Sequence, residues 1–323
     1  MKRLFLISGA YDLINCLLLI ENTKEIYANH LILYSTGNIP EKLENLTRSI
    51  SERLDCFLSY DFVSKDSLSN EEFQDALCGL IEEKDFIHSD ELVIWRLFGK
   101  LETNIIRFIS PRHLIIVENG LATYYPPVNP QLNGQYRVPD SAILPMQSFF
   151  GNPFYVPKNA VKNISKNKIR KTYSKLNALF HDLIPTFYSG DHAIVIGTSF
   201  YRMKILPDKL EENTILNCLS HLSKSRSVVF KPHPRDERDW SAIIQDKIHL
   251  DLSAIPIEII LPTLGKKVKL HSISSGSLVT GYLFFGSEII CFGEEVANIL
   301  NNQYPHVKKL RERISELNPT AKS

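Results

Sequence analysis

Cysteine is scarce in this chain, and its five residues are scattered without a Cys-x-x-Cys pair. An odd number at irregular spacing argues against a disulfide framework or a zinc site and suits a reducing compartment. An excess of one charge is missing as well, because 37 Lys and Arg residues balance 36 Asp and Glu residues, for a formal net charge of +1. This balance gives no global reason to expect a nucleic-acid partner.

Long hydrophobic runs are also absent: no stretch of 18 apolar residues occurs, so no membrane-spanning segment is expected. The first residues, Met1-Lys2-Arg3 followed by an apolar run, imitate a secretory signal. Asp12 and Glu21 interrupt the apolar region, however, and no small-residue cleavage site is evident, so we expect a β-strand there instead. These features predict a cytoplasmic protein.

Several motifs that would define a reaction are missing too. There is no G-x-G-x-x-G, which leaves dinucleotide binding unsupported, and neither a P-loop nor a G-x-S-x-G turn is present. No D-x-D pair occurs, so the usual carboxylate clamp for a metal-bound nucleotide sugar is missing. No cluster of His, Cys and carboxylates has zinc spacing. The sequence therefore predicts no metal and no cofactor.

What the chain does contain is an alternation of short apolar runs with amphipathic segments. We expect strands at 3–7, 30–34, 56–62 and 113–117 in the first half, and at 193–196, 228–230, 257–261, 268–273 and 288–292 in the second. Helices are expected at 12–20, 40–54, 70–83 and 209–223, and the Pro-, Gly- and Asn-rich region 126–157 is expected to be a long surface excursion. Such alternation predicts parallel, doubly wound sheets.

At 323 residues the chain exceeds the usual size of a single core, so two domains are expected. We expect an α/β protein with two Rossmann-like domains facing a cleft, at 1–157 and 186–323, and a basic linker helix at 158–185. The segment 158–175 carries seven Lys or Arg residues and no acid. Such a run is most often solvated; the functional interpretation is a dock for anionic lipid headgroups or an anionic acceptor glycan.

The stretch Lys231-Pro232-His233-Pro234-Arg235 follows an apolar run that indicates a short buried strand. Two prolines bracket His233, and proline can neither donate to a sheet ladder nor continue a helix, so the strand ends there. Ligands of open α/β sheets bind at that edge. A His between two cations suits a phosphate better than a metal, although a turn with a surface His has the same pattern.

Two further polar segments are expected at the same kind of edge. Gly197-Thr198-Ser199 follows a predicted strand, and Ser274-Ser275-Gly276-Ser277 lies between a predicted strand and a helix. Free backbone N–H groups at a helix N-terminus favour an anion. The alternative is that Ser274 or Ser275 is only an N-cap.

Two glutamates and two glycines complete the candidates. Glu118 follows a predicted strand, and Gly120 lets the chain turn sharply, so this carboxylate is either a base with a raised pKa or a solvent-facing loop acid. Glu258 interrupts an apolar run and is either exposed or in need of partners, such as the two hydroxyls of a ribose. Gly9 lies in the tight turn after the first predicted strand.

In combination, these segments resemble the motifs of bacterial sialyltransferases. The matching pieces are Val117-Glu118-Asn119-Gly120, Lys231-Pro232-His233-Pro234 and Ser274-Ser275, in the same order and at similar spacing. The continuation Leu121-Ala122-Thr123-Tyr124 resembles the lipooligosaccharide sialyltransferase and polysialyltransferase families. The family pattern has two adjacent acids before Gly; here the second is Asn119, which leaves Glu118 as the only candidate base of this motif.

That resemblance implies the glycosyltransferase type B (GT-B) fold, with an N-terminal acceptor-side domain and a C-terminal domain that binds the CMP-sugar. It implies an inverting, metal-independent transfer of sialic acid from CMP-Neu5Ac to a glycan hydroxyl of a bacterial surface polysaccharide or lipooligosaccharide. Glu118 would deprotonate the acceptor, and His233 would offset charge on the departing phosphate. Other residues implied to bind substrate or nucleotide are Lys231, Pro234, Glu258, Ser274, Ser275, Gly276, Gly197, Thr198, Ser199, Gly9 and Gly120. The implied partners are the donor, the glycan acceptor and, through 158–175, the inner face of an anionic membrane.

Three alternatives remain open on the sequence. A transferase of another CMP-activated nonulosonic acid or of Kdo would carry similar motifs. A sugar-nucleotide epimerase would act on a UDP-sugar without an acceptor. A non-catalytic nucleotide-binding protein would bind CMP without turnover.

Overall fold

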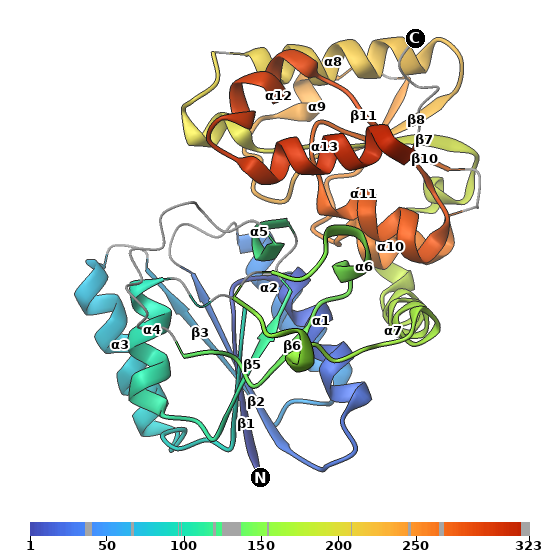
Figure 1. Ribbon diagram of the computed structural model, residues 1–323. Coiled ribbons are helices and arrows are strands. Elements are labelled where there is room, and N and C mark those ends of the chain that lie inside the picture. The colour runs from blue at the N-terminus through green and yellow to red at the C-terminus, as the bar shows by residue number, and fades with distance from the viewer. Residues whose placement is uncertain are drawn as a thin grey trace. The chain divides into compact units, whose positions relative to one another are not determined.

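The computed structural model describes residues 1–35, 41–65, 68–95, 97, 99–118, 121–124, 137–153, 155–207, 209–244, 247–264 and 268–317. The chain divides into two compact units, Met1–Thr172 and Tyr173–Ser323. Each unit is built on its own β-sheet (Figure 1). The division falls inside helix α7 (Lys166–Leu179), within the segment for which the sequence predicts a linker helix. The separate tasks assigned to the two domains stay a prediction.

The first unit contains a six-stranded sheet in the order β3-β2-β1-β4-β5-β6, and all neighbouring strands are parallel. Its strands are β1 (Lys2–Ile7), β2 (Ala28–Ser35), β3 (Ser59–Ser64), β4 (Glu91–Ile94), β5 (His113–Val117) and β6 (Ser141–Ile143). The strands in the middle of the sheet are buried, as expected where helices cover both faces of a parallel sheet. The expectation of a doubly wound sheet is confirmed.

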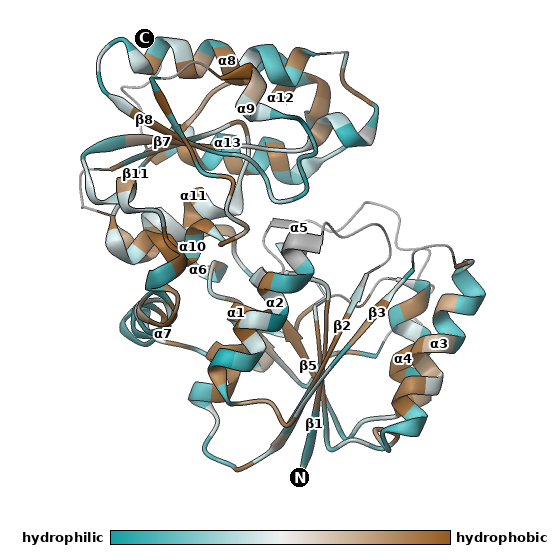
Figure 2. Ribbon diagram, turned by 180° about the vertical axis from the view of Figure 1, so that it is seen from behind, coloured by the Kyte–Doolittle hydropathy of each residue, from teal (hydrophilic) through white to brown (hydrophobic). Residues whose placement is uncertain are grey.

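The helices of this unit lie on both faces of the sheet. They are α1 (Ala10–Asn22), α2 (Glu41–Leu54), α3 (Asn70–Glu83), α4 (Lys100–Ile109) and the short α5 (Leu121–Tyr124) and α6 (Gln147–Phe150). Figures 1 and 2 show α3 and α4 on one side and α1 and α2 on the other. Helix α3 has the predicted bounds because a capping box begins it: Ser69 caps the Glu72 amide, and Glu72 accepts from the Ser69 amide at 2.8 Å.

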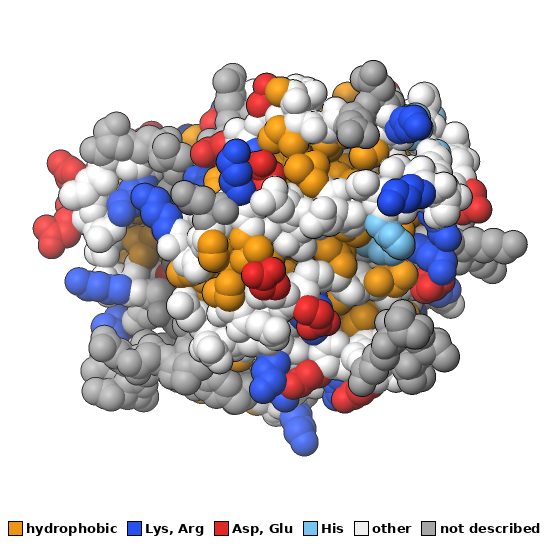
Figure 3. Space-filling view, turned by 90° about the horizontal axis from the view of Figure 1, so that it is seen from above, with side chains coloured by type: hydrophobic (Ala, Val, Ile, Leu, Met, Phe, Trp, Pro, Cys, Tyr) orange, Lys and Arg blue, Asp and Glu red, His pale blue; other side chains and the backbone are white. Residues whose placement is uncertain are grey.

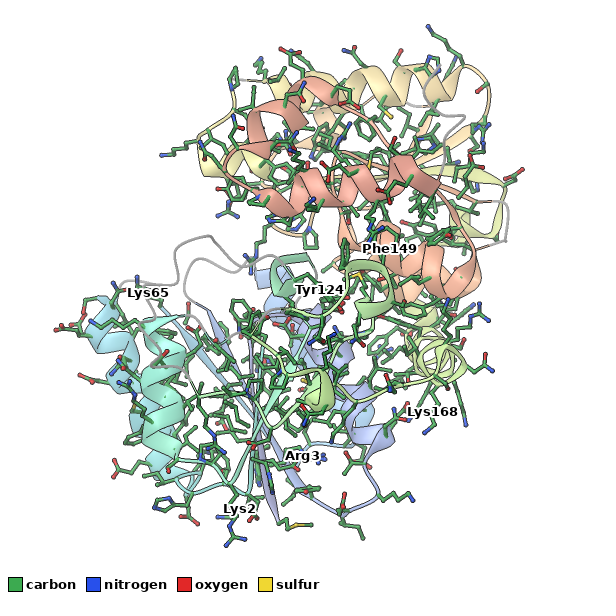
Figure 4. All side chains as sticks on the ribbon, in the orientation of Figure 1. Lys2, Arg3, Lys65, Tyr124, Phe149 and Lys168 are labelled. Atoms are coloured by element: carbon green, nitrogen blue, oxygen red, sulfur yellow. The ribbon has the colours of Figure 1, made fainter. Side chains whose placement is uncertain are left out.

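The amino end of the first sheet is closed by a buried ion pair. Arg3 Nε lies 2.5 Å from Glu91 Oε2, and the Arg3 guanidinium stacks 3.7 Å from the centre of the Tyr27 ring. Figure 4 labels Arg3 at this end and Tyr124 at the opposite, carboxyl end. The buried charge at the amino end therefore joins β1 to β4, while the predicted site residues follow the carboxyl ends of strands.

The second unit contains a five-stranded parallel sheet in the order β11-β10-β7-β8-β9. Its strands are β7 (His192–Ile196), β8 (Ser227–Lys231), β9 (Ile248–Leu250), β10 (Lys269–Ser272) and β11 (Glu288–Cys291). Counted from its first strand, this order repeats that of the first five strands of the other sheet. The two halves of the chain are thus built on the same Rossmann-like plan.

The helices of the second unit follow the same alternation. They are α8 (Leu210–Ser223), α9 (Trp240–Ile243), α10 (Ile257–Ile260), α11 (Gly276–Thr280), α12 (Glu294–Asn301) and α13 (Pro305–Leu317), with a π-helical turn at Gly281–Phe285. Figure 2 shows hydrophobic residues along the strands of both units. In the core of the second unit, Phe230 of β8 packs edge to face on Trp240, with ring centres 4.7 Å apart.

Two expectations are wrong. The run 257–261 is not a strand: Pro256 precedes helix α10, and a 3₁₀ turn follows at Leu261–Thr263. A short apolar run cannot be distinguished from a buried helical turn by periodicity, which is why the pattern misled. The region 126–157 is not only a surface excursion, because β6 pairs with β5 and extends the first sheet. Its part from 126 to 136 lies outside the described residues.

Candidate functional site

Three predicted segments of the second unit follow neighbouring strands. Strands β10, β7 and β8 lie side by side, and their last residues, Ser272, Ile196 and Lys231, are paired in register. The strand order reverses between β7 and β10, since β8 follows on one side of β7 and β10 lies on the other. Ligands of open α/β sheets bind outside the carboxyl ends of the strands at such a point. We call the segments 197–199, 232–236 and 274–277 the second-sheet edge.

His233 lies in the turn after β8 and is half-buried. Its Nδ1 accepts a hydrogen bond from the backbone N–H of Arg235 at 3.1 Å and lies 3.3 Å from the Ser199 hydroxyl oxygen. A backbone N–H can only donate, so Nδ1 is an acceptor and the neutral ring carries its proton on Nε2. The turn therefore selects the tautomer whose Nε2 has a proton to give.

A buried carboxylate holds the loop after β7. Glu211 of α8 is 1% exposed and accepts hydrogen bonds from the backbone N–H groups of Phe200 (3.1 Å) and Tyr201 (2.9 Å) and from the Thr198 hydroxyl. The side chain of Thr198 is thus directed into the protein. Its predicted contact with a nucleotide stays a prediction.

Arg238 joins that loop to the turn after β8. Its guanidinium forms an ion pair with Asp236 at 2.6 Å, lies 3.5 Å from Glu211 Oε2, and donates to the Thr198 carbonyl at 3.3 Å. Asp236 also accepts from the indole N–H of Trp240 at 2.9 Å. Because Trp240 belongs to the core, this network anchors the turn that carries His233 to the packed interior of the unit.

Lys231, the last residue of β8, is 3% exposed. Its ammonium group donates to Asp251 Oδ2 at 2.7 Å and to the Ser253 carbonyl at 3.1 Å, and the Tyr188 hydroxyl donates to the same Asp251 oxygen at 2.7 Å. Burial alone would raise the pKa of Asp251, but the charge and hydrogen bond of Lys231 outweigh it and lower this pKa. Since the ammonium group also lies 3.3 Å from the Ser253 hydroxyl oxygen, a bond from it to a nucleotide would replace one of these protein contacts.

The two serines after β10 have different surroundings. Ser275 is the N-cap of α11, and its hydroxyl accepts from the Ser277 amide at 3.2 Å. The Ser274 hydroxyl is buried, and no hydrogen-bond partner for it exists among the described residues. Buried hydroxyls are normally satisfied, so the Ser274 oxygen indicates a polar group that completes it. The N-cap interpretation therefore holds for Ser275, and Gly276 begins the helix.

Glu258 lies on α10, is 6% exposed, and accepts a hydrogen bond from the Ser277 hydroxyl at 2.5 Å. Burial raises the pKa of Glu258, and the bond from Ser277 opposes that effect. Glu258 is therefore not an exposed strand residue, and the Ser277 hydroxyl is a protein partner of its carboxylate. Its contact with a ribose stays a prediction.

In the first unit, Glu118 directly follows β5 and is wholly buried, with 0% of its surface exposed. Its Oε1 accepts from the Tyr11 hydroxyl at 2.8 Å, and its Oε2 accepts from the Met146 amide at 2.9 Å and from the Tyr124 hydroxyl. Three donors favour the ionised carboxylate, whereas burial opposes it. Burial and the neighbouring Glu118 charge raise the pKa of Tyr124 well above its ordinary value. The solvent-facing alternative for Glu118 is thus wrong.

Gly9 and Gly120, the two glycines of the first unit predicted to bind substrate or nucleotide, have different outcomes. Gly9 is the N-cap of α1, after the carboxyl end of β1, and a Cβ atom there would meet nothing within 4 Å. The protein itself leaves this space open, and the predicted substrate contact of Gly9 stays a prediction. Gly120 and Asn119 lie outside the described residues.

Three features concern the part of the chain that the structure describes: metal-binding groups, membrane-spanning helices and disulfides. No group of three or more His, Cys, Asp or Glu among those residues is arranged to hold a metal ion. No helix among them has the length and apolar character needed to cross a bilayer. None of the five cysteines, all of which lie in the described ranges, forms a disulfide.

Residues 3–292 match the Alpha-2,8-polysialyltransferase (POLYST) family, which is nearly the whole chain. The chain belongs to this family. It is a glycosyltransferase of the sialyltransferase class, so the resemblance carried by the short motifs is confirmed. Membership implies a CMP-sialic acid donor and a glycan acceptor.

Solved structures show that this polysialyltransferase-family chain has a GT-B-like fold, as expected. UDP-N-acetylglucosamine 2-epimerase from Methanocaldococcus jannaschii superposes with a TM-score of 0.59 at 11% identity, over 98% of this chain and 92% of that chain. UDP-N-acetylglucosamine 2-epimerase from Rickettsia bellii superposes with a TM-score of 0.56 at 11% identity, over 99% of this chain and 98% of that chain. An α/β-galactoside α-2,3-sialyltransferase from Photobacterium phosphoreum has a TM-score of 0.47 at 16% identity, over 98% of this chain and 99% of that chain. These likenesses concern the fold alone, and curated protein sequences give no significant match.

Sequence reasoning missed the charged residues that hold the predicted site segments in place. Glu211, Arg238 and Asp251 are buried or half-buried and bond to the loop after β7, to the turn after β8 or to Lys231, and no local pattern distinguishes them from surface charges. Tyr11 offered one signal, since it closes the small-residue turn after the first strand. Tyr124 ends the Leu121-Ala122-Thr123-Tyr124 segment that carried the resemblance.

Proposed function

We propose that this chain transfers sialic acid from CMP-Neu5Ac to a hydroxyl of a bacterial surface polysaccharide or lipooligosaccharide, with inversion and without a metal ion. The observation that supports this most is the second-sheet edge. There the His233 tautomer has a proton on Nε2, and the buried Ser274 hydroxyl has no partner among the described residues. Both groups can donate to an anion, which is what a departing phosphate requires.

Donor binding follows from the same edge. The CMP phosphate would accept hydrogen bonds from Ser274 and from backbone N–H groups at Ser275 and Gly276, and His233 would give it a proton or a hydrogen bond as the glycosidic bond breaks. The loop 197–199 and Pro234 would line the nucleotide. Glu258 would hold the ribose hydroxyls, for which its carboxylate is an acceptor.

The acceptor would react through the first unit. The hydrogen bonds from Tyr11, Tyr124 and the Met146 amide favour the ionised form of Glu118, which would take the proton of the attacking hydroxyl, directly or through a partner. A single displacement on the anomeric carbon inverts its configuration. Because the family's name specifies α-2,8 linkage, the C8 hydroxyl of a terminal sialic acid is the first acceptor to test.

The test is incubation with CMP-Neu5Ac and a panel of sialosides and galactosides, with and without EDTA, and with CMP-Kdo as a competing donor. We expect transfer that chelator does not diminish. Glu118→Gln and His233→Ala should each abolish transfer while the thermal transition is kept, and His221→Ala, an exposed His on α8, is the matched control. Loss of activity with EDTA would overturn the metal-free mechanism, and full activity of either variant would overturn the role of that residue.

The basic segment supports a second part of the proposal, peripheral binding to an anionic membrane. On α7 the apolar Ile169, Tyr173 and Leu176 are buried. The exposed residues of this helix include Lys166, Lys168, Arg170, Lys171 and Lys175, and Figure 4 labels Lys168 on it. By contrast, acidic and basic side chains are interspersed on the face seen in Figure 3. A juxtamembrane basic residue contributes about 1 kcal/mol of attraction to anionic lipid.

Vesicle sedimentation tests this binding. We expect the protein to sediment with phosphatidylglycerol-containing vesicles at low salt and not with neutral vesicles. Replacing Lys168, Lys171 and Lys175 by Gln should weaken binding on the order of a hundred-fold, at about 1 kcal/mol each. The matched control replaces Lys308, Lys309 and Arg313 of α13, whose charges are paired with Glu312 and Glu316. Equal loss in both triple variants would contradict a role for α7.

A further inference from the structure

The carboxylate of Glu118 is enclosed by the protein. None of its surface is exposed, and each of its two oxygens already accepts a hydrogen bond from a protein donor. An acceptor sugar is too large to enter such a site without rearrangement of the packed side chains around it. A proton that reaches Glu118 from a sugar hydroxyl therefore has to pass through one of the groups bonded to the carboxylate.

A hydroxyl partner can pass a proton on in this way, whereas a backbone N–H does not. Among the described residues, the hydroxyls of Tyr11 and Tyr124 bond to Glu118, and the two phenols differ in position. Tyr124 is 6% exposed, and its ring packs on Phe150 with centres 5.1 Å apart. Tyr11 is half-buried in the first turn of α1, which begins where β1 ends at the carboxyl edge of the first sheet. Of the two phenols, Tyr11 is the one with surface open to a substrate.

We propose that Tyr11 is a catalytic residue that contacts the acceptor hydroxyl and relays its proton to Glu118. This inference rests on the proposed function, since it concerns the same transfer reaction. Its structural basis is the 2.8 Å bond from the Tyr11 hydroxyl to Glu118 Oε1, together with the different exposure of Tyr11 and Tyr124.

The relay moves two protons while the acceptor oxygen attacks. The acceptor oxygen forms its bond to the anomeric carbon while its proton passes to the Tyr11 oxygen, and Tyr11 passes its own proton to Glu118 Oε1. The bond between the anomeric carbon and the CMP phosphate breaks, and its electron pair leaves with CMP. Tyr11 is neutral before and after, and Glu118 ends protonated. The reverse relay then returns the proton from Glu118 to water.

The hydrogen bonds around Glu118 suit this relay. A phenol with an ordinary pKa of about 10 lies between a sugar hydroxyl and a carboxylate in acidity, so a concerted shift avoids a free phenolate. The bonds from Met146 N–H and Tyr124 to Oε2 hold the carboxylate while Oε1 receives the proton. Asn15 fixes the backbone of Glu118 by donating to its carbonyl oxygen at 2.9 Å.

The experiment compares Tyr11→Phe with Tyr124→Phe, because each removes one phenol that donates to Glu118. For Tyr11→Phe we expect kcat to fall on the order of 10²–10³-fold with the KM for CMP-Neu5Ac unchanged. Tyr124→Phe should lower kcat much less than Tyr11→Phe does, because no proton passes through Tyr124, and should move the acid limb of the pH profile upward, since one donor fewer stabilises ionised Glu118. In mixtures of H2O and D2O, the wild-type rate should follow a curved dependence on the D2O fraction, because two protons move.

The outcomes separate this inference from the proposed function. Absence of transfer by the wild-type protein would overturn both. Transfer by the wild type and by Tyr11→Phe at equal kcat, with Glu118→Gln inactive, would overturn the relay alone. Equal losses in Tyr11→Phe and Tyr124→Phe with the same pH profile would show that both phenols only position Glu118, which also overturns the relay.

A second variant covers the case in which Tyr11→Phe does not fold. Incorporation of 3-fluorotyrosine at position 11 keeps the shape of the side chain and lowers the phenol pKa. A change in kcat and in the pH profile relative to the wild type supports the relay. Wild-type values for both would overturn it.

Discussion

Gly197 and His233 are in backbone contact. A Cβ atom on Gly197 would lie 3.0 Å from the His233 amide nitrogen and 3.0 Å from the Pro232 Cα. The Gly197 N–H also donates to the Lys231 carbonyl at 2.8 Å. The loop after β7 and the turn after β8 therefore approach so closely that a side chain at position 197 would press on the backbone of the turn.

We predict that Gly197→Ala displaces the turn that carries His233. The added methyl group meets backbone atoms, which cannot rotate away, so we expect a loss of about 1–3 kcal/mol in the free energy of unfolding and at least a ten-fold lower kcat/KM for CMP-Neu5Ac. Denaturant titration and initial rates measure the two effects. The control is Gly79→Ala in α3, where a Cβ meets nothing within 4 Å and alanine should stabilise the helix by about 1 kcal/mol. Unchanged kinetics for Gly197→Ala would show that the close contact does not position His233.

The sequence predicted elements well wherever the signal was local. Helix α3 has a capping box at its first turn, and strands such as β5 are uninterrupted apolar runs. Strand β9 is three residues long, and its register against β8 depends on contacts that no window of sequence contains. The strand predicted at 257–261 was wrong for a related reason: a short run of apolar residues is expected both for a fully buried strand and for a buried helical turn.

The positions of Glu118 and His233 in the fold were predictable, but their hydrogen-bond partners were not. Each residue lies within two positions of the end of a buried strand, and such residues lie at the carboxyl edge of a parallel sheet. Their roles in the reaction stay a prediction. The partner Tyr11 is 107 residues from Glu118 in the sequence, and Asp251 is 20 residues from Lys231. Which charged residues become buried depends on the packing of distant elements, so a single sequence does not contain that information.

We predict that Glu211→Gln loosens the loop after β7. The amide replaces one acceptor oxygen by a donor, which faces the backbone N–H of Phe200 or Tyr201 and leaves it unpaired. The expected loss is about 1–3 kcal/mol in the free energy of unfolding, with weaker binding of CMP. Thermal unfolding and calorimetric CMP titration measure it. Glu212→Gln, one residue along the same helix, is the matched control and should have no effect beyond its charge; equal effects of the two variants would refute a specific role for Glu211.

We predict that removing one partner of the buried ion pair of Lys231 and Asp251 lowers the free energy of unfolding more than replacing both partners by apolar residues. The single variant Lys231→Met leaves the buried Asp251 carboxylate without its counter-charge and should lower the free energy of unfolding by about 3–5 kcal/mol. The double variant, Lys231→Met with Asp251→Leu, removes both charges and should recover part of that loss. CMP titration of the double variant then tests the predicted nucleotide contact of Lys231. Wild-type affinity would exclude that contact, and lost affinity in a stable double variant would support it.

The same pair predicts a pH dependence. The pKa of Asp251 is lower in the folded protein than its ordinary value of 3.8, because the Lys231 charge outweighs the opposing effect of burial. The stabilisation is therefore fully present above the unfolded pKa and is lost as the pH falls through the folded pKa. In denaturant titrations between about pH 7 and pH 2, the wild type should lose stability relative to the double variant once the pH falls below the unfolded pKa of 3.8. A difference that stays constant over this range would contradict an ionised Asp251.

We predict opposite effects for the two adjacent serines after β10. Ser275→Ala removes the N-cap of α11 and should cost about 1 kcal/mol in the free energy of unfolding, with CMP affinity little changed. Ser274→Ala removes a buried hydroxyl that has no partner among the described residues, so stability should be unchanged or higher. If that hydroxyl bonds to the CMP phosphate, affinity for CMP should fall on the order of 10–100-fold, as expected for a hydrogen bond to a charged group. Calorimetric titration with CMP and denaturant unfolding on both variants provide the measurement, and each variant is the control for the other. A Ser274→Ala protein that binds CMP as tightly as the wild type would remove Ser274 from the nucleotide site.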